Sequence, residues 1–358
     1  MHRCIVWASC GLGLALLLVG QPLVGQNLEL RFLDVGQGDA ILIRNQGKSV
    51  LVDAGPSRAI LPRLQVLGVT ALDLLIASHN HADHLGGMAA VLSGLPVRFY
   101  MDNGVPTTSQ IYARVLSLVE SRKVAYLRAT ARTITVGDAT LRIMPPPAEL
   151  QRDQNNSSIG VEVRRGRFRA LLTGDSQQPE LSAWLASDSI EVVDALKAPH
   201  HGSRPGVMPG WLARTRPKVI VISVGKGNAY GHPDPWALRY YEANGRHVYR
   251  TDRDGDVVLQ VAPDGGYEVT ARRSPGSSVP TPGIALTFTP ESLSLGGAGS
   301  TFPACGTGYA SGKACENTCI SQCSTCCQPP GCAYDARPQQ SVLRCRPVRG
   351  QDRRADQR

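Results

Sequence analysis

Short apolar runs separated by polar turns dominate the chain and predict a protein built mainly of β-strands. The breaks at 36–38 and 45–47 carry glycine with glutamine or asparagine, a composition that favours hairpin turns. The runs predicted as strands are 28–35, 40–43, 49–52, 72–77, 97–100, 125–127, 133–136, 140–144, 159–163, 168–172, 192–197, 219–224, 248–249 and 257–260.

Helices are predicted where apolar residues recur every three or four positions. These segments are 60–67, 88–92, 111–119, 180–185 and 236–240. Because blocks of strands and helices alternate in two successive halves, the pattern predicts two sheets packed face to face with helices outside. The fold class is therefore expected to be α+β.

A dense group of metal-binding residue types follows the predicted strand 72–77. Segment 79–84 reads His-Asn-His-Ala-Asp-His, with three imidazoles and one carboxylate in six positions. Such donors suit Zn²⁺, Mn²⁺ or iron, and a His-x-His pair on an extended segment points both rings the same way. We expect one or two divalent ions here. His79 and His81 would hold the first, and Asp83 and His84 the second.

Further candidate ligands end other predicted strands. Asp175 follows the strand 168–172 and is expected to bridge two ions through separate carboxylate oxygens. His201 and His232 also follow strands, and sequence alone leaves open which one closes the metal site and which one contacts substrate. Asp53 is left at another strand tip.

Water acidified by the ions would be the nucleophile at neutral pH. We expect Asp83, His201 and His232 to be the catalytic residues. A structural and a functional role stay equally open for His200, whereas His247 lies within a β segment and is expected to be structural.

Residues 1–25 are expected to be a signal peptide. Arg3 precedes the apolar stretch 11–20, which is too short to span a bilayer comfortably. An uncleaved N-terminal anchor is the alternative, because neither Gly20 nor Gly25 offers a clean cleavage site. Export would give a secreted or periplasmic location. The net charge of +9 favours acidic partners such as nucleic acid, and it agrees equally well with solubility alone.

The composition changes after residue 271, where a Pro/Ser/Gly-rich linker is expected over 272–303. Eight of the ten cysteines then lie in 304–346, so an exported chain is expected to hold them as disulfides, with a zinc site as the alternative. Cysteines recur every fourth residue from 315 to 327, which is a helical spacing. This module could contact a cell-surface partner. The basic tail 347–358 either holds a polyanion or is a solvated end.

Segment 79–84 resembles the signature of the metallo-β-lactamase superfamily. Seven ordered motifs narrow the resemblance to the hydrolase domain of the ComEC/Rec2 competence family. They lie at 32–40, 51–55, 78–87, 155–158, 171–175, 196–203 and 230–233. The resemblance covers roughly 28–269 and implies a four-layer αββα metallo-β-lactamase sandwich. In that family the domain is attached to a membrane DNA channel and is thought to degrade the non-transported strand.

Two departures from the resemblance matter. Many superfamily members carry a histidine where this chain has Asn155 and Asn156, which implies an oxygen ligand and favours Mn²⁺ over Zn²⁺. The polytopic membrane region is missing from this sequence, so we expect a free-standing version whose Cys-rich module the family does not predict.

The sequence thus predicts an exported metal-dependent hydrolase in residues 27–271, in the first place a phosphodiesterase or nuclease. One alternative keeps the metal site and changes the substrate to a lactone, an ester or a β-lactam. The other alternative is a surface-binding protein in which the Cys-rich module matters and the hydrolase body is vestigial.

Overall fold

The computed structural model describes residues 27–150, 153–187, 189–244 and 247–272, with three short strands at 286–288, 312–315 and 318–321. The chain divides into two compact units, Met1–Leu293 and Ser294–Arg358. The expected signal peptide and basic tail lie outside the described residues, as does most of the expected linker and Cys-rich module.

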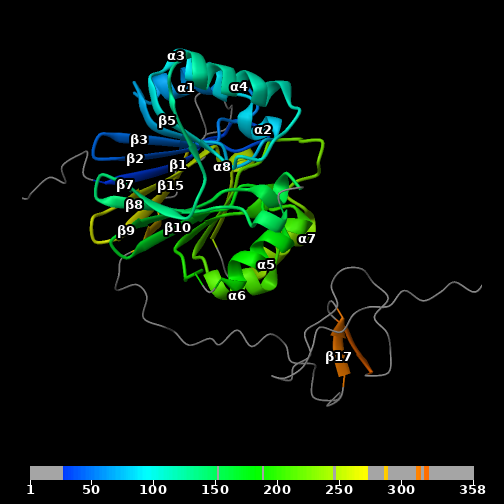
Figure 1. Ribbon diagram of the computed structural model, residues 1–358. Coiled ribbons are helices and arrows are strands. Elements are labelled where there is room, and N and C mark those ends of the chain that lie inside the picture. Colours follow the sequence, from blue (N-terminus) through cyan, green and yellow to red (C-terminus); the bar gives the residue numbers. More distant parts are fainter. Residues whose placement is uncertain are drawn as a thin grey trace, which may run out of the picture. The chain divides into compact units, whose positions relative to one another are not determined.

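Two sheets make up the described part of the first unit (Figure 1). The larger has the strand order β16-β15-β14-β1-β2-β3-β4-β5-β6, in which β3 to β6 run parallel. Its strands are β1 (Leu28–Phe32), β2 (Ile41–Asn45), β3 (Lys48–Val52), β4 (Leu72–Ile76), β5 (Val97–Asp102), β6 (Ala125–Arg128), β14 (Asp256–Val261), β15 (Tyr267–Arg272) and β16 (Leu286–Phe288).

The smaller sheet has the order β13-β12-β11-β10-β9-β8-β7, in which β10 to β13 run parallel. Its strands are β7 (Arg132–Val136), β8 (Ala139–Met144), β9 (Gly160–Arg165), β10 (Phe168–Leu172), β11 (Ala195–Lys197), β12 (Val219–Ile222) and β13 (His247–Arg250). Within each sheet, the loops at the carboxyl ends of these parallel strands therefore lie at the same edge.

Helices cover the outer face of each sheet (Figure 1). The larger sheet is covered by α1 (Ile60–Val66), α3 (Met88–Gly94) and α4 (Gln110–Ser121), and the smaller by α5 (Gln178–Ala186), α6 (Pro209–Thr215) and α7 (Pro235–Ala243). Two single-turn helices, α2 (Ala82–Leu85) and α8 (Thr251–Asp254), lie in loops. This is the predicted four-layer αββα sandwich.

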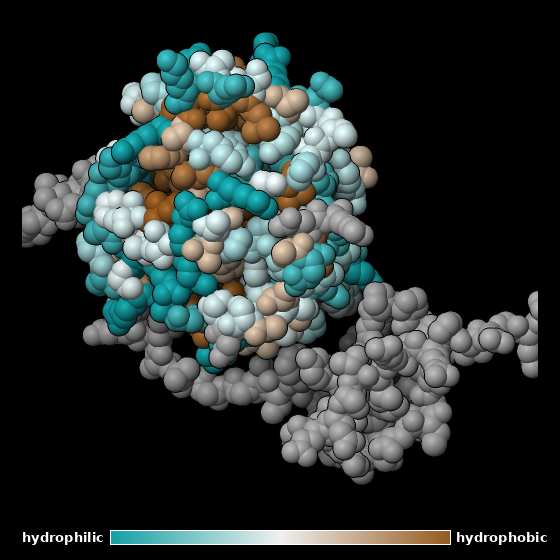
Figure 2. Space-filling view, viewed as in Figure 1, coloured by the Kyte–Doolittle hydropathy of each residue, from teal (hydrophilic) through white to brown (hydrophobic). Residues whose placement is uncertain are grey.

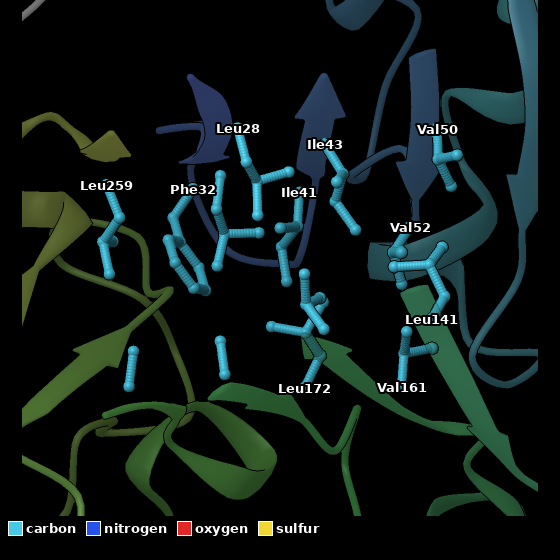
Figure 3. Packing of buried hydrophobic residues seen from close by; sticks show 14 of the residues in the cluster. Leu28, Phe32, Ile41, Ile43, Val50, Val52, Leu141, Val161, Leu172 and Leu259 are labelled. Atoms are coloured by element: carbon cyan, nitrogen blue, oxygen red, sulfur yellow. The ribbon is translucent and has the colours of Figure 1, made fainter. Parts of the chain in front are cut away.

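The core between the sheets follows from strand alternation, because every second side chain of a strand points to the same face. Figure 3 shows Phe32 and Ile41 of the larger sheet pointing toward Leu172 of the smaller one, all buried. Two further cores lie between each sheet and its helices. On the face drawn in Figure 2, hydrophilic residues are interspersed with smaller apolar areas, as is usual for a folded surface.

Most predicted elements are confirmed, with differences at the start of one strand and at one helix. The strand expected over 192–197 begins only at Ala195, because Val193 N donates to the Thr215 carbonyl oxygen at the end of α6 rather than to a neighbouring strand. Helix α6 was missed, although Pro209 at its first turn is a recognisable helix start.

The expected linker and cysteine helix need correction. Strand β16 lies inside the segment 272–303 and pairs with β15, so the larger sheet continues past residue 271. In the second unit, β17 (Gly312–Cys315) pairs antiparallel with β18 (Thr318–Ser321). Cys315 and Cys319 therefore lie on paired strands, and the four-residue spacing between them reflects a hairpin rather than a helical turn.

Candidate metal centre

The carboxyl ends of parallel strands from both sheets bring the predicted ligands to one place. Strand β4 leads into His79 and His81, β10 leads into Asp175, and β11 leads into His201. Glycine permits the loops to meet closely, since a Cβ on Gly38 would lie 2.1 Å from the Asp83 carbonyl oxygen. Rigid strands thus position loop residues that lie far apart in the sequence.

One group of donors joins Asp83, His84, Asp175 and His201, whose ligand atoms lie within 4.8 Å of one another. Asp175 Oδ2 is 3.3 Å from both His84 Nε2 and His201 Nε2. His201 Nε2 is also 3.3 Å from Asp83 Oδ2. Two imidazoles and two carboxylates therefore converge on one small volume.

A second group joins His79, His81 and Asp175. His79 Nε2 lies 3.0 Å from His81 Nδ1 and 3.8 Å from Asp175 Oδ2. The same carboxylate oxygen thus faces both groups, whereas the sequence analysis expected separate oxygens. Asp175 Oδ1 is directed elsewhere and lies 3.4 Å from Lys197 Nζ.

The donors of the first group fit a divalent cation. His84 Nε2 and His201 Nε2 are buried and have no hydrogen-bond partner within the described part of the chain. Burial opposes protonation of His201, yet the carboxylates of Asp175 and Asp83 raise its pKa to about 9. The pocket therefore attracts positive charge, and its nitrogen and oxygen donors are those that Zn²⁺, Mn²⁺ or iron accept.

His201 and His232 occupy different positions, which the sequence left open. His201 belongs to the first donor group, with Nδ1 held 2.8 Å from the Ser223 carbonyl oxygen. His232 belongs to none of the donor groups found among the described residues, and its ring stacks on that of His201 at 6.4 Å between centroids. His200 Nε2 lies 3.8 Å from Asp175 Oδ2.

Comparison with known proteins agrees with this geometry. Residues 33–226 match the family model described as the metallo-β-lactamase superfamily. The chain belongs to this superfamily. It thus has the fold of a metal-dependent hydrolase, and the groups around Asp175 are its candidate divalent-metal site. The predicted superfamily is confirmed.

Relatives within the superfamily confirm the resemblance to the ComEC/Rec2 family. ComE operon protein 3 of Bacillus subtilis is 26% identical over 265 residues, covering 67% of this chain and 34% of its own length. Recombination protein 2 of Haemophilus influenzae is 30% identical over 268 residues, covering 70% of this chain and 31% of its own length. The chain thus spans about a third of the length of these relatives. A solved metal-dependent hydrolase of the β-lactamase superfamily aligns at 14% identity and a TM-score of 0.44, over 66% of this chain and 99% of that one.

Within the part of the chain that the structure describes, none of the helices combines the length and apolar character needed to cross a lipid bilayer.

A layer of buried polar residues holds the superfamily's metal loop, and the sequence analysis missed most of it. Asp53 accepts hydrogen bonds from Ser78 N and Ser78 Oγ, both at 2.7 Å, and lies 2.8 Å from His84 Nδ1. A carboxylate on Nδ1 orients the ring so that Nε2 faces the metal site. The sequence signals for Asp53 were its position at a strand tip and its place in the motif 51–55.

We expect Asp53→Asn to lower metal affinity by about 10- to 100-fold, because His84 loses its orienting carboxylate. Asp53 has a φ of 59°, and asparagine also adopts this left-handed region, so the change mainly removes charge. Chelator competition measures the affinity. The control is Asp73→Asn, which removes a carboxylate paired with the half-exposed Lys48. Equal affinities in all three proteins would contradict the orienting role.

Lys197 is the least expected member of this layer. It is fully buried, with Nζ 2.7 Å from Asp39 Oδ2 and donating at 2.6 Å to the Gly174 carbonyl oxygen. Burial lowers its pKa, but the carboxylates of Asp39 and Asp175 outweigh burial and raise it. Lys197 is therefore a fixed positive charge beneath the centre.

The pair Asn155 and Asn156 occupies the loop where many superfamily members have a histidine. Asn156 Oδ1 accepts from Gln177 N at 3.2 Å and from Glu180 N at 3.4 Å, so it caps the first turn of α5. Asn155 Oδ1 is buried and has no hydrogen-bond partner among the described residues. The cap gives Asn156 a structural role, and an oxygen ligand from this loop stays a prediction for Asn155.

Glu180, which bonds Asn156 and Ser158 of this loop, should make the stability of the protein depend on pH. It is fully buried, and burial raises its pKa well above the ordinary value of 4.5. The native state therefore keeps a proton that the unfolded chain releases above about pH 4.5, so stability falls as pH rises toward the native pKa. Glu180→Gln should remove this loss.

The difference between Glu180→Gln and the native protein tests this effect. Below about pH 4 the two should be equally stable, and the variant's advantage should then grow by up to about 1.4 kcal/mol per pH unit. Urea denaturation across pH 4–8 measures it, with exposed Glu242→Gln on α7 as the control. A pH-independent difference would contradict the assignment.

Proposed function

We propose that this chain is an exported metal-dependent phosphodiesterase that acts on nucleic acid, in a secreted or periplasmic setting. The observation that carries the proposal is the convergence of Asp83, His84, His201 and Asp175, with two buried imidazole nitrogens that lack hydrogen-bond partners among the described residues. Support for the substrate comes from the net charge of +9 and from relatives named for competence and recombination.

Asp83, His84 and His201 would hold one divalent ion, and His79 and His81 a second. A bound divalent ion supplies an acidified water and a polarised phosphoryl oxygen at neutral pH. Asp175 faces both positions with the single oxygen Oδ2, and its other oxygen is held by Lys197. The chain thus contributes fixed donors whose orientation is set before substrate binds.

His232 is proposed as a substrate-facing residue rather than a metal ligand. Burial, followed by the charge of neighbouring His201, lowers its pKa, so the ring is neutral at pH 7 and carries one N–H. Burial likewise lowers the pKa of His200 to about 4. These two rings lie 5.5 Å apart beside the donor groups, where an N–H could bind a phosphoryl oxygen or the leaving group.

A substrate panel tests this function. Natively purified protein should contain a divalent metal by elemental analysis. It should cleave bis-p-nitrophenyl phosphate and single-stranded DNA, and Asp83→Ala should lose this activity. Rapid nitrocefin turnover without phosphodiester cleavage would overturn the substrate, and full activity in Asp83→Ala would overturn the metal assignment.

One observation favours a different substrate for the same site. Hydroxyacylglutathione hydrolase of Aeromonas hydrophila is 38% identical over 55 residues, which cover 15% of this chain. A thioester or other ester is therefore the second candidate, and adding such a substrate to the panel decides between them. Purified protein that holds no metal and cleaves none of these would favour a surface-binding role for the Cys-rich module.

A further inference from the structure

The loop that follows β12 presents an aromatic side chain beside the metal centre. Asn228 builds this loop: its Oδ1 accepts from Tyr230 N at 3.1 Å and from His232 N at 3.0 Å. Its Nδ2 donates to the carbonyl oxygens of Gly225 and His232 at 2.9 and 2.6 Å. One side chain thus holds both ends of the turn, and it fixes the backbone position of Tyr230 before any ligand binds.

Tyr230 is unusual among the large side chains of the described residues because it is 70% exposed. One face of its ring lies on His232, with 5.9 Å between centroids and 18° between planes. His232 in turn stacks on His201 at 6.4 Å and 26°. A row of three roughly parallel rings therefore runs from a candidate metal ligand to solvent.

Packing does not account for the exposed ring. Tyr126, the other exposed tyrosine among the described residues, is 47% exposed and donates its hydroxyl to Asp102 at 2.7 Å. The Tyr230 side chain makes no hydrogen bond within the described part of the chain, and it is absent from the apolar cores. A rigidly held ring with a free face at the mouth of a site is the feature on which proteins stack nucleobases.

We infer that Tyr230 binds an unpaired nucleobase next to the phosphodiester that reaches the metal centre. This inference rests on the proposed function, because it needs a nucleic-acid substrate. The base must be unpaired, since a base within a duplex is already stacked on its neighbours. Stacking tolerates every base, so Tyr230 would favour single strands without selecting a sequence.

Two oligodeoxynucleotides of equal length test the inference, one with bases and one made entirely of abasic sites. The metal-loaded protein should prefer the base-bearing strand in kcat/KM. Tyr230→Ala should reduce this preference by about tenfold, mainly through KM, because one base–aromatic contact is lost. Tyr230→Phe should keep the preference, since it keeps the ring. Val66→Ala, which shortens an 88% exposed side chain on α1, is the matched control and should behave as the native protein.

The outcomes separate this inference from the proposed function. Cleavage of both strands with the same preference in Tyr230→Ala as in the native protein would overturn the role of Tyr230 and leave the phosphodiesterase intact. An equal loss on base-bearing and abasic strands would overturn it too, because the ring would then act on the backbone. Failure of the native protein to cleave either strand would refute the proposed function, and the inference with it.

Discussion

Replacing Asp175 by asparagine is expected to lower phosphodiester turnover by about 1000-fold or more. Its Oδ2 lies 3.3 Å from His84 Nε2 and His201 Nε2 and 3.8 Å from His79 Nε2, so one charged oxygen serves both donor groups. Metal ions contribute several kcal/mol to transition-state stabilisation, and each 1.4 kcal/mol is about tenfold in rate. Loss of the negative charge on the shared oxygen should therefore reduce both metal content and kcat/KM.

The control for this substitution is Asp264→Asn, the same chemical change in the turn between β14 and β15. The Asp264 carboxylate accepts from the nearby Gly266 N, and its carbonyl oxygen accepts from Arg167 N, which precedes β10, whereas Asp175 follows the other end of that strand. The metal content of Asp264→Asn, measured by elemental analysis, and its kcat/KM should match those of the native protein. Retention of two ions and of normal turnover by Asp175→Asn would show that Asp175 does not hold the centre.

Lys197→Met is expected to destabilise the metal-free protein by about 3–5 kcal/mol. The substitution leaves Asp39, which is 1% exposed, as a buried charge whose close cation is gone, and such breaks are far more costly than loss of an exposed pair. Adding Asp39→Asn should restore much of the stability, since the uncompensated charge is then removed. Urea denaturation of the single and double variants measures both effects.

A second lysine, which is only partly buried, allows a matched comparison. Lys218 Nζ lies 2.6 Å from Asp194 Oδ1, but its side chain is 27% exposed whereas that of Lys197 is fully buried. Lys218→Met should therefore cost about 1 kcal/mol or less, because water can solvate the remaining carboxylate. If the two lysine variants lost equal stability, burial would not be the reason why Lys197 matters.

Much of the fold could be predicted because strand signals are local. Apolar runs such as 168–172 and 219–224 are read from a few neighbouring residues, and β10 and β12 lie within them. The failures come from contacts between segments that are separated in the sequence. Val193 N bonds the carbonyl oxygen of Thr215 at the end of α6, and residues 286–288 form a strand only because β15 offers its edge. A contact between distant segments cannot be predicted from a few neighbouring residues.

The choice between His201 and His232 shows the same limit at the site. Both histidines follow parallel strands of one sheet, so their position after a strand cannot separate them. His200 and His201 have φ values of 48° and 54°, and this sharp turn brings the His201 ring to Asp175. Asn228 holds His232 on a different loop, one ring further out. The backbone geometry of two loops therefore determines that His201, and not His232, joins the donor group around Asp175.

The sequence by itself determined the strand and helix pattern, the superfamily and the ligand-rich segment 79–84, because these depend on residues that are neighbours in the chain. Only the tertiary structure decided that one oxygen of Asp175 serves both donor groups, that Asp53 orients His84, and that Lys197 is buried against Asp39. The physical reason is that each of these is a charge or hydrogen bond between separate segments. Its strength depends on distance and burial, which exist only after the two sheets have packed together.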